Sequence, residues 1–147
     1  MMNKSEFVYV TYIRTTPQKL WDALTTPEFQ KQYWFGAYTT SDWKAGSSWD
    51  LRFSDAQIVD AGEIAESDPP KRLAIKWRNE KPEMKAEGYS LCVFDIEPAG
   101  EVVKLTVSHG MDYPNAKTIH AVSGGWPKVL SNLKSLLETG QVVLGRY

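Results

Sequence analysis

The sequence predicts a single α+β domain, residues 1–147, in which a curved antiparallel sheet of six or seven strands wraps around a long C-terminal helix. Two patterns carry this prediction. Strand-like segments fill residues 38–109, and an apolar stripe at helical spacing marks the last third of the chain. A single helix that follows a set of strands can bury its apolar stripe only against the sheet. A sheet that grips one helix in this way tends to leave a cavity between them.

The first expected strand covers residues 6–14 and is apolar on both faces. One face carries Phe7, Tyr9, Thr11 and Ile13, and the other carries Val8, Val10 and Tyr12. Because strands in the middle of a sheet are typically apolar on both sides, this strand is predicted to be central. Two short helices follow it, since Thr16-Pro17 and Thr26-Pro27 each place an N-cap residue before a proline suited to the first helical position.

Further strands are expected at about 39–43, 49–53, 57–66, 72–78, 89–97 and 102–109. The short links between most of them favour antiparallel neighbours. In that arrangement the links 54–57, 79–88 and 110–118 lie at one end of the sheet, and the tight turns 44–46, 67–70 and 98–100 lie at the other. An opening is expected at the first end, near 79–88 and 110–118, because long polar loops can move. Residues 89–96 are apolar at both parities, so their inward face stays undetermined.

The C-terminal helix carries its apolar stripe on one face and ends before Gly140, a residue type favoured just past a helix C-terminus. The stripe consists of Trp126, Val129, Leu130, Leu133, Leu136 and Leu137. Pro127 lies within this segment, and a proline in a helix interior removes one backbone hydrogen bond. We therefore expect either a helix over about 118–139 that bends near 124–127, or a helix that begins only near Gly125. Gly124 and Gly125 are interpreted as room for a close approach of the helix.

Composition excludes several classes of partner. Seventeen basic and eighteen acidic residues give a formal charge of −1 without a basic stripe, which argues against nucleic acid and anionic membranes. No apolar run approaches the roughly 20 residues that span a bilayer, and the first residues lead into a strand rather than a signal sequence. Cys92 is the single cysteine, so a reducing cytoplasm is expected.

Several motifs, in this order and spacing, resemble one known family. They are residues 17–28 (PQKLWDALTTPE), Trp34, Gly62-Glu63-Ile64, residues 68–73 (DPPKRL), Trp77, residues 104–109 (KLTVSH), and Gly125-Trp126 with the leucine-rich helix. The chain thus looks like a member of the activator-of-heat-shock-protein-90-ATPase homologue family, a branch of the START-like (SRPBCC) helix-grip superfamily, over about residues 6–140. The resemblance implies a helix-grip fold of the START or birch-pollen-allergen type, with an internal, mostly apolar cavity. It implies less about activity, because members include small-ligand binders and a co-chaperone domain.

The residues offer little catalytic or metal-binding chemistry. His109 and His120 are the only histidines, and no metal-ligand motif occurs, so we expect no metal, no cofactor and no catalytic residue. Ser108 and His109 point to opposite faces of a strand and cannot pair. His109 ends an apolar face near the expected opening. It is either a hydrogen-bonded histidine at the rim of the core, or a polar anchor or acid–base group with Asp112 or Tyr113 nearby.

The expected ligand site lies between the helix stripe and the concave face of the sheet. Its residues are Trp49, Phe53, Ile75, Trp77, Leu105, Val107, Trp126, Leu130 and Leu133, with His109 and Tyr89 as polar handles. Each aromatic residue could instead fill the core. A tryptophan in place of Leu130 is expected to block the site.

The predicted function is non-catalytic binding of a small apolar or aromatic molecule. The alternatives are a co-chaperone-like regulator of a heat-shock-protein-90-type ATPase in the stress response, and a cyclase- or hydrolase-like enzyme that uses the same cavity. A co-chaperone needs a partner surface, and the sequence indicates no exposed apolar patch. The ligand and the oligomeric state stay open.

Overall fold

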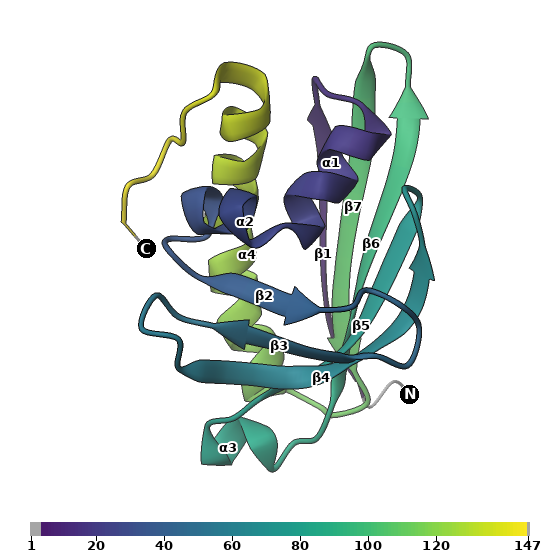
Figure 1. Ribbon diagram of the computed structural model, residues 1–147. Coiled ribbons are helices and arrows are strands. Elements are labelled where there is room, and N and C mark those ends of the chain that lie inside the picture. The colour runs from purple at the N-terminus through teal and green to yellow at the C-terminus, as the bar shows by residue number, and fades with distance from the viewer. Residues whose placement is uncertain (1–3, 147) are drawn as a thin grey trace.

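The computed structural model describes residues 4–146, which form one seven-stranded antiparallel sheet and four helices (Figure 1). The strands are β1 (Ser5–Ile13), β2 (Tyr38–Ser41), β3 (Ser48–Arg52), β4 (Ile58–Asp68), β5 (Arg72–Asn79), β6 (Ser90–Ala99) and β7 (Val102–Met111). The helices are α1 (Pro17–Thr25), α2 (Pro27–Tyr33), α3 (Pro82–Lys85) and α4 (Lys117–Thr139). This arrangement confirms the predicted helix-grip architecture.

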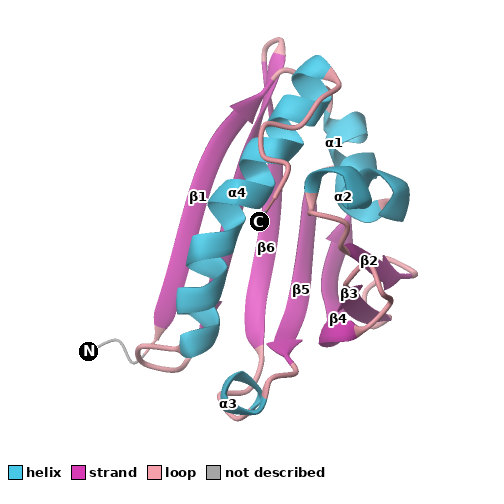
Figure 2. Ribbon diagram, turned by 90° about the vertical axis from the view of Figure 1, so that its left-hand side faces the viewer, coloured by secondary structure: helices cyan, strands magenta, loops and turns pink. Residues whose placement is uncertain are grey.

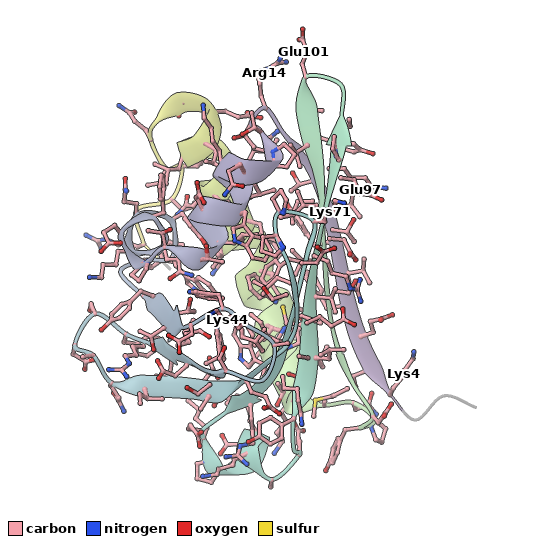
Figure 3. All side chains as sticks on the ribbon, turned by 45° about the vertical axis from the view of Figure 1, so that its right-hand side comes forward. Lys4, Arg14, Lys44, Lys71, Glu97 and Glu101 are labelled. Carbon is pink, nitrogen blue, oxygen red and sulfur yellow. The ribbon has the colours of Figure 1, made fainter. Side chains whose placement is uncertain are left out.

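The strand order is β1-β7-β6-β5-β4-β3-β2. The long helix α4 packs along β1 and β7, while α1 and α2 lie beside it, above β2–β4 (Figure 2). Arg14 and Glu101 lie at one end of the sheet, where an ion pair of 3.6 Å joins them, and Lys4 lies at the other end (Figure 3). The links therefore alternate between the two ends as predicted, with the tight β6–β7 turn opposite the β7–α4 link.

The first strand is an edge strand, and its predicted central position is wrong. β1 stands at the end of the strand order and pairs with β7. Its inner residues pack against the core, whereas Val8, Val10 and Tyr12 are about half exposed on the outer face. Apolar residues on both faces of a strand are expected when both faces are buried. They also occur, as here, when one face is buried and the other leaves its apolar side chains partly exposed.

Two strand bounds also differ from expectation. β2 stops at Ser41, and Trp43 lies beyond it with a positive φ of 60°, a conformation that does not continue a strand. Tyr89 lies just before β6 rather than in it.

The strand register settles which face of β6 points inward. Cys92 pairs with Ile75 and Phe94 pairs with Val107, and all four side chains are buried.

The helix α4 is continuous across Pro127, so the alternative in which it begins near Gly125 is wrong. Its stripe is buried at Trp126, Val129, Leu130 and Leu133, and Gly140 ends it with a φ of 83° while its N–H donates to the Leu136 carbonyl at 2.9 Å. The predicted close approach at Gly124 is also wrong, because a Cβ there would meet no atom within 4 Å.

The N-terminus of α4 is tied to the β5–β6 link. The Glu87 carboxylate accepts hydrogen bonds from the backbone N–H groups of Lys117 at 2.7 Å and Thr118 at 3.0 Å, and from the Thr118 hydroxyl at 2.8 Å. These bonds satisfy helix N–H groups that have no partner inside the helix. They also fasten together the two loops that were expected to frame an opening.

A sharp bend of the sheet brings β2, β3 and β4 across the first half of α4 (Figure 1). Gly62 in β4 permits this bend, since a Cβ at that position would lie 1.7 Å from the Lys76 carbonyl oxygen of β5. A register shift between Ile64 and Glu66 adds to the curvature. The curled strands form one wall of the groove described below.

Candidate functional site

Side chains fill the interior between the second half of α4 and the sheet. The space left beside Leu130, Trp49 and Ile75 measures only about 10 Å³. Leu130 and Leu133 are fully buried, as are Leu105 and Val107 opposite them. This part of the structure is packed core, so a tryptophan at Leu130 would overpack it rather than block a site.

An open groove of about 420 Å³ lies beside the first half of α4. Its walls come from the α2–β2 corner, the ends of β3 and β5, the start of β4, and α4. The lining residues are Trp34, Phe35, Ala37, Leu51, Phe53, Asp60, Trp77, Ala121, Val122, Gly125, Trp126 and Val129. The volume falls within the range of about 300–1,000 Å³ that is typical of small-molecule sites. None of the lining residues comes from the links 79–88 and 110–118, where the opening was expected, and Phe53 is about half exposed.

Three tryptophan rings form the aromatic wall of the groove. The ring centroids of Trp34 and Trp126 lie 5.4 Å apart, those of Trp77 and Trp126 5.7 Å, and those of Trp34 and Trp77 6.3 Å. Trp49 packs behind them, 4.4 Å from Trp77, and is buried. Phe35 reaches the groove from a corner in which it adopts a positive φ of 54°, an uncommon conformation for a bulky residue.

His109 lies beneath this wall and is fully buried. The Trp126 indole N–H donates to His109 Nδ1 at 3.1 Å, so the proton of the neutral ring is on Nε2. Nε2 lies 2.7 Å from Ser90 Oγ, and Ser90 in turn donates to the Trp77 carbonyl at 2.9 Å. Burial lowers the pKa of His109 to about 3, which keeps it neutral. His109 is therefore a satisfied core histidine that holds Trp126, with partners other than Asp112 and Tyr113.

Asp60 is the one ionisable side chain among the described residues that line the groove. It is 6% exposed, and its Oδ1 accepts a hydrogen bond from Asn79 Nδ2 at 2.7 Å. Burial raises the pKa of Asp60 to about 6, while hydrogen bonds from the Asn79 and Trp77 side chains act in the opposite direction and the charge of Glu80 adds to the rise. The groove thus combines an apolar aromatic wall with one carboxyl group.

Comparison with known proteins identifies the family. Residues 14–138 match the family described as activator of Hsp90 ATPase homolog 1-like protein. The chain belongs to this family. No curated protein matches it significantly.

Solved structures with the same fold include three at about one-fifth identity. A protein from Mesorhizobium loti has 20% identity and a TM-score of 0.76, with 90% of this chain and 96% of that chain covered. An HSP90 activator from Plasmodium falciparum has 19% identity and a TM-score of 0.71, with 90% and 95% covered. A protein from the dynemicin biosynthetic locus has 20% identity and a TM-score of 0.75, with 97% of this chain and 49% of that chain covered. At these identities the likeness shows the fold alone.

The structure divides the sequence-predicted site residues among three places. Phe53, Trp77 and Trp126 line the groove. The buried core holds Trp49, Ile75, Leu105, Val107, His109, Leu130 and Leu133. Tyr89 lies on the outer face, where its ring packs against Arg78 at 4.7 Å and Lys76 at 5.3 Å, so it is no polar handle of this groove.

Sequence reasoning missed the residues that complete the groove, above all Asp60, Trp34 and Val122. A signal for Asp60 existed, because it shares the parity of Ile64 along β4 and Ile64 is an obvious core residue. No sequence pattern indicated that the α2–β2 corner lines the groove.

In residues 4–146, no three His, Cys, Asp or Glu side chains come together as metal ligands. Within the same residues, no helix is long and apolar enough to cross a membrane.

Proposed function

We propose that this chain binds a small, largely apolar or aromatic molecule in the groove between α4 and β3–β5, without chemistry of its own. The observation that carries the proposal is the groove itself, about 420 Å³ in volume and walled by Trp34, Trp77 and Trp126. Acid–base catalysis commonly requires two convergent polar groups, and a single carboxyl favours binding over catalysis. A cytoplasmic setting fits the buried, unpaired Cys92.

Binding can be tested with N-phenyl-1-naphthylamine, a neutral apolar fluorophore. Binding is expected to saturate, to quench tryptophan emission, and to raise stability by about 2.7 kcal/mol at a hundredfold excess over Kd. Phe53→Ala should weaken binding about tenfold, because it removes a groove wall worth roughly 1.5 kcal/mol of apolar contact. The matched control is Phe29→Ala, which also truncates a partly exposed phenylalanine, but on α2 outside the groove lining.

Val122→Trp serves as a blocking variant, since Val122 lines the groove whereas Leu130 does not. It should abolish the signal while the circular dichroism spectrum stays unchanged. If the probe fails to saturate the wild-type protein, or if Phe53→Ala and Phe29→Ala weaken it equally, the groove is not a ligand site.

The second candidate is a regulator of a heat-shock-protein-90-type ATPase. The family and the HSP90 activator from Plasmodium falciparum support it, and so does an exposed apolar row on β1 formed by Val8, Val10 and Tyr12. Apolar rows of this kind are often covered by protein partners. The expected result is stimulation of such an ATPase by the chain and loss of stimulation with Val10→Glu. An unchanged ATPase rate at saturating protein excludes this function.

A further inference from the structure

The groove carries an electrostatic feature that ordinary apolar pockets lack. Asp60 lies in its wall and is ionised above about pH 6. Among the described residues, the charged group that acts on Asp60 is Glu80, which is also negative and is paired with Lys85 at 3.1 Å and Arg78 at 3.7 Å. Residues 4–146 therefore supply hydrogen bonds to this carboxylate, through Asn79 and Trp77, but no counter-charge.

The aromatic wall of the groove also favours a positively charged ligand, as the Asp60 carboxylate does. Trp34, Trp77 and Trp126 line the groove together, with ring centroids 5.4 to 6.3 Å apart. The face of an indole ring attracts a cation more strongly than the face of other aromatic side chains. A cation in the groove, against these rings and beside Asp60, gains from both features, whereas a ligand carboxylate would meet the like charge of the buried Asp60 side chain.

We infer that the ligand of this groove is an apolar or aromatic amine, whose ammonium group pairs with the Asp60 carboxylate while its apolar part packs on Trp77 and Trp126. The inference rests on the proposed function, because it names the chemical class that the groove selects. It assigns Asp60 as the residue that sets specificity and the tryptophan wall as the source of most of the affinity. If Asp60 had a purely structural role, it would only hold Asn79 and Trp77 in place, and the charge of the ligand would not change its affinity.

Three naphthalene derivatives of similar size and different charge test this selectivity. They are 2-naphthylmethylamine, 2-naphthalenemethanol and 2-naphthoic acid, which at pH 7.5 are cationic, neutral and anionic. Isothermal titration calorimetry with the wild-type protein is expected to give the amine a Kd at least about tenfold below that of the alcohol, with the acid weakest. This comparison needs no substitution, so it does not depend on whether a variant folds.

Variants then identify the residue responsible. Asp60→Asn is expected to bring the amine and the alcohol within about twofold of each other while the alcohol binds as before. Glu63→Gln is the matched control, because Glu63 is a carboxylate of the same strand that lies 3.5 Å from Lys76, outside the groove lining. It should leave the tenfold preference intact.

The outcomes separate the two proposals. Equal affinity of the wild-type protein for all three ligands overturns the amine selectivity and leaves the apolar groove standing as a site. A preference for the amine that survives in Asp60→Asn also overturns it, since Asp60 is then not the anchor. If none of the three ligands binds, and the neutral fluorophore fails as well, both proposals fall.

Discussion

Trp126 joins the helix, the groove and the core through a single side chain. Its ring faces the groove and lies near Trp34, Trp77 and Phe94, while its N–H donates to His109. Because His109 Nδ1 is buried, that acceptor has no access to water. The indole therefore contributes both apolar contact and the hydrogen bond that satisfies His109.

Replacing Trp126 by phenylalanine separates these two contributions. The smaller phenyl ring would keep much of the apolar contact and leave His109 Nδ1 without a donor, so we expect a loss of about 1–3 kcal/mol in the free energy of unfolding. Trp126→Ala removes the ring as well and should lose about 3–5 kcal/mol. Urea denaturation measures both values. A phenylalanine variant within about 0.5 kcal/mol of wild type would show that the hydrogen bond contributes nothing.

Single residues differ in how far their place could be predicted. The burial of Trp126 followed from helical spacing with Leu130 and Leu133. The partners of His109 could not be predicted, because Ser90 and Trp126 are 19 and 17 residues away and their approach depends on strand register. Asp60 shares the parity of the core residue Ile64, but it was missed because an isolated acidic residue in a strand is usually solvated.

Among the elements, α4 is the helix with a proline in its interior. Pro127 cannot donate to the Ser123 carbonyl, yet the helix continues through it. The apolar stripe on either side of Pro127 is buried against the sheet, and this packing offsets the missing hydrogen bond. The buried face and the end of the helix at Gly140 were predictable from the sequence, whereas its continuity through Pro127 was not, because local propensity and tertiary packing act in opposite directions there.

Pro127→Ala should therefore stabilise the protein, by about 1–3 kcal/mol, since it restores the backbone donor within an existing helix. Pro17→Ala is the matched control, because Pro17 occupies the first turn of α1, where no backbone donor is required. The control should be neutral or slightly destabilising. Thermal unfolding of both variants decides the matter, and a destabilised Pro127→Ala protein would mean that the ring itself supports the groove side of α4.

At the scale of the whole molecule, the groove results from the curl of β2–β4 over α4. Its position depends on Gly62, on the corner at Phe35 and on the Glu87 contacts that close the neighbouring loops. Alternation predicted how the links divide between the two ends of the sheet. It could not predict which loops would be fastened together, because that depends on hydrogen bonds between segments about 30 residues apart.

Two buried titratable groups give the folded protein opposing responses to pH. His109 has a folded pKa of about 3 against 6.5 in the unfolded chain, so the unfolded chain takes up its proton first and stability falls as pH drops from about 6.5 to 3. Asp60 has a folded pKa of about 6 against 3.8, so its contribution is fully present below pH 3.8 and is lost as pH rises through 6. Between about pH 4 and 6 the two effects largely cancel.

The difference in stability between each variant and wild type isolates the contribution of the group that was replaced. Relative to wild type, Asp60→Asn is expected to gain stability at pH 8 and to lose that advantage by about 1.4 kcal/mol per pH unit between pH 6 and 4, or roughly 3 kcal/mol in all. His109→Gln should show the opposite slope, a deficit at pH 8 that shrinks on acidification. Urea denaturation at intervals from pH 4 to 8 gives both difference curves, in which the other titrating groups cancel. Parallel, flat difference curves for the two variants would mean that neither group is buried in the charge state that the structure implies.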